Sequence, residues 1–197
     1  MKQFDWDSDF NSFRKRGIEA LMTALKSNII NAPMSNAAEC DRAIQCVSDA
    51  LLNFIGKAGC GAHYDILEPL SALAISLAYV SDQNVKHRVV MSISQIGSKM
   101  SAEQKSSSAC KEVIDTLVGV LKHADDWYAN VIVDAIHSLD GCNGLINALS
   151  SAECDSERAR LASAIATIMQ RRLNDSANSE SSSFVNKKQK IGGAFSP

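Results

Sequence analysis

The sequence has few prolines and few aromatic residues, and neither sign of charge dominates it. Its 197 residues include only three prolines, and aromatic side chains make up 6%. A β-sandwich is therefore disfavoured, because strands are rich in aromatic and β-branched residues. The 20 basic and 22 acidic residues give a formal net charge of −2, which offers no excess of positive charge for nucleic acid. With 46% hydrophobic residues and abundant Ala and Ser, the chain can bury one sizeable core, and we predict an all-α fold.

Long apolar runs are missing as well, so we expect no membrane-spanning helix. A secretory signal needs a basic and then an apolar segment near the start, but Asp5, Asp7 and Asp9 lie there. The six cysteines form no Cys-x-x-Cys pair, which favours free thiols in a reducing compartment over a disulfide framework. These absences predict a cytoplasmic protein. Nuclear import, suggested by the basic cluster at 187–190, and secretion as an effector are the alternatives.

Apolar residues recur at helical spacing from about residue 18 to about residue 169, and turn or capping residues divide them into eight helices. Pro33 ends the first helix, and Pro69 fits the third only within its first turn. Ser101 and Gln104 form the pattern of a capping box, which we expect at the start of the fifth helix. The eight apolar stripes begin at Ile18, Ile44, Ile66, Val85, Ala109, Tyr128, Leu145 and Leu161.

The even-numbered helices share one pattern. Leu51, Ile93, Ile136 and Ile165 take equivalent places in them, at separations of 42, 43 and 29 residues. Each of these residues belongs to a stripe that also includes the positions eight before, four before and three after it. Glu157 is the one charged residue in the four stripes. Periods of about 20–50 residues in a helical chain are typical of solenoids, in which each unit buries its face against its neighbours. We therefore expect an α-solenoid of about four antiparallel helix pairs.

These pairs resemble HEAT repeats, in which an A helix with an early proline leads through an aspartate-bearing turn to a B helix. Leu67-Glu68-Pro69-Leu70, followed by Asp82-Gln83-Asn84-Val85-Lys86, matches this pattern. The segments 117–128 and 145–158 are two further units, although Ala129 and Glu157 depart from the usual residues. The resemblance covers about residues 14–170, with armadillo-like helical pairs as the alternative. It implies a stack of helix pairs that binds partners along the surface lined by the B helices.

The composition divides the chain into three parts. Residues 1–13 form an acidic N-terminal extension, and residues 14–173 carry the helical repeats. Residues 174–197 are rich in Ser and Asn and contain the basic cluster at 187–190. We expect this C-terminal tail to be disordered, because it has too few apolar residues to bury.

No pattern in the sequence predicts an enzyme, a metal site or a cofactor. His63, His87, His123 and His137 occur singly, without the spacing that places two ligands on one helix face. The glycine-rich stretch 56–61 follows a helix and lacks the known nucleotide-binding patterns, so it indicates a helix end and a linker. No cysteine lies in a nucleophile motif. We therefore expect a non-enzymatic protein that holds no cofactor.

One mixed polar and aromatic stripe lies beside the core stripe of the sixth helix. Its members Trp127, Asn130, Asp134 and His137 are spaced by three, four and three residues, so they share one side of the helix. On the helix one repeat earlier, His87 and Met91 flank this stripe. Because the HEAT resemblance implies binding along these helices, we predict that the six residues contact a partner, with Trp127 as the anchor. The alternative is that Trp127 only covers the adjacent turn.

The sequence thus predicts a protein-binding module (an adaptor, regulator or assembly factor) whose partner docks on the even-numbered helices. A secreted bacterial effector with the same binding mode is one alternative. A HEAT-like nucleic-acid-binding protein is a second, although residues 14–170 hold 14 basic and 17 acidic residues, a sum of −3. A HEAT-like enzyme resembling the bilin lyases is a third. The sequence does not indicate an oligomeric state.

Overall fold

Every element in the described part of the chain is a helix. The computed structural model describes residues 16–27, 37–57 and 66–192, and no strand occurs among them, which confirms the predicted all-α fold. None of these helices combines the length and the apolar character needed to cross a bilayer. A helix over residues 16–27 comes first. It is followed by α2 (Ala37–Lys57), α3 (Leu67–Ser76), α4 (Gln83–Gly97), α5 (Ala102–Lys105), α6 (Ser108–Leu121), α7 (Asp126–Ser138), α8 (Cys142–Ser150) and α9 (Asp155–Gly192).

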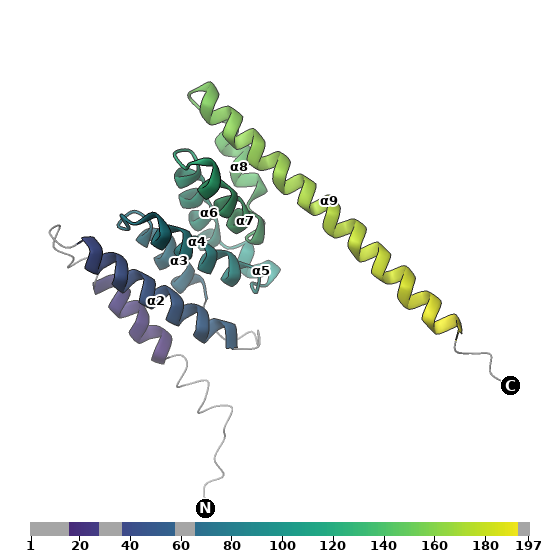
Figure 1. Cartoon of the computed structure of the whole chain (residues 1–197), viewed down its shortest axis with the longest axis horizontal. Helices are drawn as coiled ribbons and strands as arrows, with labels where there is room; N and C mark the ends of the chain where they lie inside the picture. The colour runs from purple at the N-terminus through teal and green to yellow at the C-terminus, as the bar shows by residue number, and fades with distance from the viewer. Residues whose placement is uncertain (1–15, 28–36, 58–65, 193–197) are drawn as a thin grey trace, which may run out of the picture.

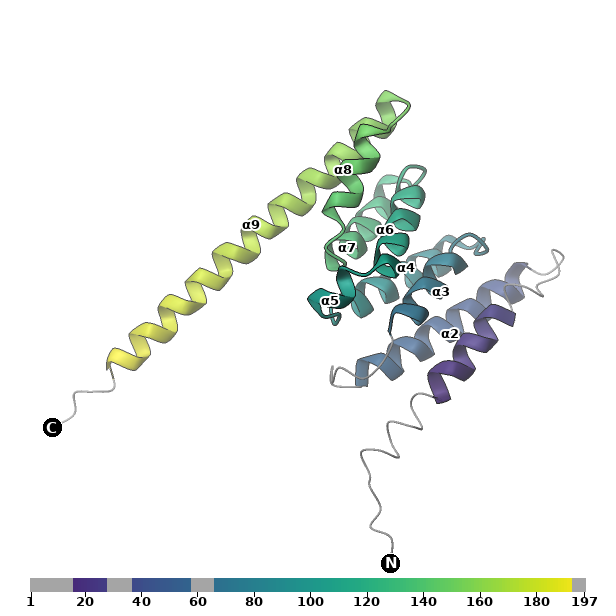
Figure 2. The same cartoon turned by 180° about the vertical axis from the view of Figure 1, so that it is seen from behind.

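The larger helices form two rows that pack against each other (Figure 1). One row consists of α2, α4, α7 and α9, each in contact with the next, and the other consists of α3, α6 and α8. Contacts of α3 with α4, α6 with α7 and α8 with α9 join the rows. The view from behind shows the helix over 16–27 beside α2 at one end and α9 at the other (Figure 2). The largest fully buried side chains are Leu25, Ile44, Leu51, Leu70, Leu73, Ile93, Ile96, Leu117, Leu121, Ile132, Ile136 and Leu139.

The predicted fifth helix is divided into two. The capping box of Ser101 and Gln104 is present, but it caps only the four-residue helix α5. The hydroxyl of Ser107 then accepts a hydrogen bond from the Cys110 N–H at 3.1 Å and caps the separate helix α6. Serine side chains compete for backbone hydrogen bonds and favour caps over helix interiors, which explains the break within the serine run at 106–108.

The residues predicted to take equivalent core places are fully buried in three helices and only half-buried in the fourth. Leu51, Ile93 and Ile136 are fully buried, as expected from their equivalent places. In α9, however, Ala164 is buried while Ile165 is only half-buried. Because α9 is the last helix of its row and packs on α7 and α8, its buried side is narrower and turned toward them.

The structure differs from the prediction of a disordered tail over residues 174–192. These residues continue α9, which extends away from the other helices in Figure 1. The physical reason is that no proline or glycine occurs between Asp155 and Gly192, so nothing in the sequence stops the helix once it has begun. The acidic extension 1–13, the last residues of the tail (193–197) and most of the glycine-rich linker lie outside the described residues.

A buried carboxylate of α2 fastens the turn that precedes α4. Asp41 accepts hydrogen bonds from the Ser81 N–H at 2.9 Å, the Ser81 hydroxyl at 2.6 Å and the Asp82 N–H at 2.9 Å. Asp82 in turn caps the start of α4. Burial alone would raise the pKa of Asp41, but these hydrogen bonds and the charge of Lys86 outweigh it and lower the pKa. One side chain of α2 thus holds the beginning of the next helix in its row.

We predict that Ile136→Asp unfolds the protein, whereas Ile75→Asp does not. The first substitution places an unpaired carboxylate in the core, which costs on the order of 5 kcal/mol, comparable with the whole stability of a domain. Ile75 is the matched control, because its side chain is 56% exposed on α3. Thermal melts followed by circular dichroism measure both. A wild-type melting temperature for Ile136→Asp would show that the core face is misplaced.

We predict that Asp41→Asn lowers stability by about 1–3 kcal/mol near neutral pH, because it weakens three hydrogen bonds to a charged acceptor. The folded pKa of Asp41 lies below its ordinary 3.8, so its stabilisation is present above that pH and is lost as pH falls through the folded value. Denaturant unfolding across pH should therefore show a difference in the free energy of unfolding between wild type and variant, and this difference should vanish in acid. Asp49→Asn, an exposed carboxylate of α2 at 3.6 Å from Arg88, should leave stability almost unchanged. If the difference in unfolding free energy stayed the same in acid, the charge of Asp41 would not be the source of its stabilisation.

Candidate functional site

An exposed tryptophan lies on the face of the α2–α4–α7–α9 row. Trp127 is the second residue of α7 and is 56% exposed, while its neighbour Tyr128 is buried. Asp125 fixes this orientation by accepting a hydrogen bond from the Tyr128 N–H at 2.7 Å. The His87 ring of α4 lies against Trp127, with ring centroids 4.5 Å apart and planes tilted by 40°. Met91, one helical turn after His87, is also exposed, and we call these three residues the Trp127 patch.

The other predicted contact residues lie on α7 but do not all share this surface. Asn130 is exposed, and its side-chain amide donates to the Asp126 carbonyl of its own helix at 3.0 Å. Asn130 also lines an open groove of about 500 Å³ between α7 and α9. Asp134 and His137 instead contact Arg171 and Asp175 of α9. The structure therefore brings Trp127 and His87 together, with Met91 one turn further along α4, and turns Asp134 and His137 toward α9.

Ion pairs hold α9 against the second half of α7. Asp134 pairs with Arg171, and the Nε2 of His137 lies 3.8 Å from a carboxylate oxygen of Asp175. The Nδ1 of His137 is buried without a hydrogen-bond partner among the described residues. The sequence places Asp175 in the predicted disordered tail and so does not predict its contact with His137. The pair of Asp134 with Arg171 depends on how α9 packs against α7, which spacing along one helix does not determine.

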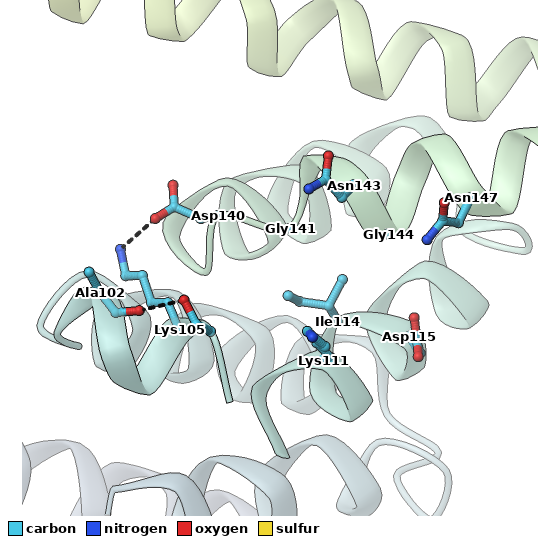
Figure 3. A pocket seen from close by; sticks show the side chains of 11 residues that line it. Ala102, Lys105, Lys111, Ile114, Asp115, Asp140, Gly141, Asn143, Gly144 and Asn147 are labelled. Carbon is cyan, nitrogen blue, oxygen red and sulfur yellow. Dashed lines mark hydrogen bonds and ion pairs between the residues drawn. The ribbon is translucent and has the colours of Figure 1, made fainter. Parts of the chain in front are cut away.

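A second surface feature is a polar groove between α6 and α8, with a volume of about 610 Å³. Figure 3 shows Lys105 pointing to Asp140 at one end, with a distance of 3.7 Å between ammonium and carboxylate. The Ser106 hydroxyl donates to the Ala102 carbonyl at 2.8 Å, and the other four polar side chains of the groove make no hydrogen bond or ion pair within the described chain. They are Lys111, Asp115, Asn143 and Asn147.

Two glycines allow the close approach of α6 and α8 that forms this groove. A Cβ added at Gly144 would lie 2.6 Å from the Cγ2 of Ile114. A Cβ added at Gly141 would lie 2.8 Å from Ile136 and 3.0 Å from Ile114. At the two glycines α8 presents only backbone to the groove, and the side chain of Ile114 forms the floor there. The Gly-x-x-Gly spacing in the sequence is the signal that could have indicated it.

The groove combines hydrogen-bonding side chains with apolar surface. Its two lysines are balanced by two carboxylates, so it does not concentrate charge of one sign as a phosphate site does. Across residues 16–27, 37–57 and 66–192, no three His, Cys, Asp or Glu side chains are grouped so that they could hold a metal ion.

The described cysteines differ sharply in environment. Cys40, Cys46, Cys110, Cys142 and Cys154 are free thiols, as predicted, while Cys60 lies outside the described residues. Burial raises the pKa of the Cys40 and Cys110 thiols. Cys154 is exposed, and a hydrogen bond with the Ser156 hydroxyl at 3.2 Å lowers the pKa of its thiol. Cys110, which lies near the groove, is thus poorly suited to act as a nucleophile.

The chain matches no protein-family model, no curated protein and no solved structure at a significant level. Its function therefore has to be inferred from its own surface. Two features of that surface stand out, the Trp127 patch and the polar groove between α6 and α8.

We predict that Cys154 reacts with iodoacetamide well before Cys40 and Cys110 in the folded protein. The thiolate is the reacting species, and Cys154 combines exposure with a lowered pKa. Peptide mapping by mass spectrometry after a short labelling pulse distinguishes the sites. As a control, the labelling rates of the three cysteines should converge in denaturant. Rapid labelling of Cys110 in the native protein would contradict the burial of this α6 side chain.

Proposed function

We propose that this protein is a HEAT-like α-solenoid of about four antiparallel helix pairs that binds another protein through the Trp127 patch. In this proposal α2, α4, α7 and α9 are the B helices. The helix over 16–27, α3, α6 and α8 are the A helices. The protein works as an adaptor, regulator or assembly factor and performs no chemistry of its own.

The packing supports the repeat assignment. Each B helix contacts the next B helix, and α3, α6 and α8 also contact in succession. Leu51, Ile93 and Ile136, which are spaced by 42 and 43 residues, occupy the same buried place in successive units. A chain in which units touch mainly their sequence neighbours is the physical signature of a solenoid.

The observation that carries the binding proposal is the exposure of Trp127. A tryptophan left 56% exposed gains from a partner that covers it, because burying the rest of its apolar surface is favourable. Its contact with His87 restricts the ring before a partner arrives, which reduces the entropy that binding has to overcome. Met91 adds an adaptable apolar side chain to the same patch.

A protein partner fits this surface better than a nucleic acid. Asp126 is exposed next to Trp127, and the exposed cation Arg88 on α4 is paired with Asp49 of α2. A surface for phosphate groups would instead present several unpaired cations. Apolar and aromatic side chains among balanced charges are typical of protein–protein contact sites.

We predict that Trp127→Ala weakens capture of the partner while Ile75→Ala preserves it. Ile75 is an equally exposed apolar residue, also 56%, but it lies on α3 in the other row. Affinity capture from cells that express the protein, compared by quantitative mass spectrometry, identifies proteins that depend on Trp127. Binding of the purified partner should then weaken by roughly 1–4 kcal/mol.

Both variants should keep the wild-type helix content and melting temperature, since neither residue is buried. Partners retained equally by wild type and Trp127→Ala would place the binding site elsewhere. His137→Ala is a poorer test, because it also removes the contact with Asp175 of α9.

A further inference from the structure

The outward side of α9 carries an apolar stripe that no other helix covers. Its members are Ala162, Ala166, Met169 and Leu173, and all four are exposed. Met169 is 44% exposed, and Leu173 is 66% exposed. Their spacing of four, three and four residues places them on one side of the helix. We call these four residues the α9 outer stripe.

This stripe lies on a different side of α9 from the residues by which α9 joins the protein. Leu161, Ala164 and Ile168 are buried against the body, and α9 contacts α7 and α8. Both views show α9 at the edge of the molecule with its far side unobstructed (Figures 1 and 2). The row of helices therefore stops at an apolar surface, whereas terminal units of helical stacks ordinarily present a polar outer face.

The other end of the stack is polar. On the helix over 16–27, the outward residues include Glu19, Thr23 and Lys26. Lys26 is also paired with Glu68 of α3 at 2.7 Å. A head-to-tail contact between copies would bury these charged groups against Leu173, which is unfavourable. Among the residues whose exposure the structure describes, the two ends are thus unlike, and only the α9 end has an apolar surface to cover.

We propose that two copies of this chain form a dimer by packing their α9 outer stripes together, antiparallel about a two-fold axis. The stripe is self-complementary in that arrangement. Positions 162 and 173, like positions 166 and 169, are symmetric about the same point on the helix. Each large side chain of one copy then lies opposite an alanine of the other, Leu173 on Ala162 and Met169 on Ala166.

A parallel pairing lacks this match. It sets Leu173 against Leu173 and alanine against alanine, so the helices would be held apart at one end and leave a gap at the other. In the antiparallel pairing the alanines let the two helix axes approach evenly. Arg158, the cation beside the stripe, is already paired with Asp155 at 3.0 Å and adds no unpaired charge to the contact.

The oligomeric state of the full chain tests the proposal. Sedimentation velocity over a range of concentrations should show a monomer–dimer equilibrium for the wild type. Met169→Glu with Leu173→Glu should weaken the dimer by about 100-fold or more, since it buries four carboxylates per dimer. Ile75→Glu with Tyr79→Glu, at exposed apolar residues of the other row and the loop after it, should leave the dimer unchanged. Circular dichroism confirms that each variant is folded, because all four residues are exposed.

The direction of the two helices can be tested separately. One preparation carries Ala162→Cys and another carries Leu173→Cys, and both are treated with a short bismaleimide alone and after mixing. Antiparallel packing predicts a link between residues 162 and 173 in the mixture only, because like positions then lie eleven residues apart, about 16 Å along the helix. Peptide mapping separates this link from any at the exposed Cys46 or Cys154.

Three results would overturn the proposal. They are a wild type that stays monomeric at every concentration, a dimer that tolerates the Met169 and Leu173 substitutions, and links that form within the separate preparations instead of the mixture.

Discussion

Each long helix in the described part of this protein has an apolar stripe that it cannot bury by itself. The stripes of α2, α4 and α7 are covered only because each helix packs on the next and on the opposite row. The positions of the surface features therefore depend on the burial of these apolar stripes against neighbouring helices. It positions α7 so that Tyr128 points inward and Trp127 outward, and it leaves α9, which has no further neighbour in the row, with an apolar side in the open.

Much of the architecture follows from local patterns in the sequence. The spacing of Leu51, Ile93 and Ile136 correctly predicts the buried side of three helices, because the core requires apolar residues at those places. The length of α9 did not follow, since the polar composition after residue 174 suggests disorder while the absence of helix breakers permits a helix. The division of α5 from α6 depends on which of several serines caps a helix, and spacing alone does not decide that.

The surface was less predictable than the core, because it depends on how helices approach each other. The neighbourhood of Trp127, His87 and Met91 follows from the repeat period, which aligns successive helices. The contacts of Asp134 and His137 do not, because they depend on how α9 packs against α7, which spacing along one helix does not determine. The polar groove arises from the distance between α6 and α8, a property of the packed structure that no single segment encodes.

The contact between Gly144 and Ile114 also restricts how the sequence can vary. Because a Cβ at position 144 would lie 2.6 Å from Ile114, any larger residue there requires a smaller one at position 114, thirty residues earlier. The two positions are therefore expected to change together in related chains. Variation at one position without compensation at the other would separate α6 from α8, and the groove would lose its shape before the core lost its stability.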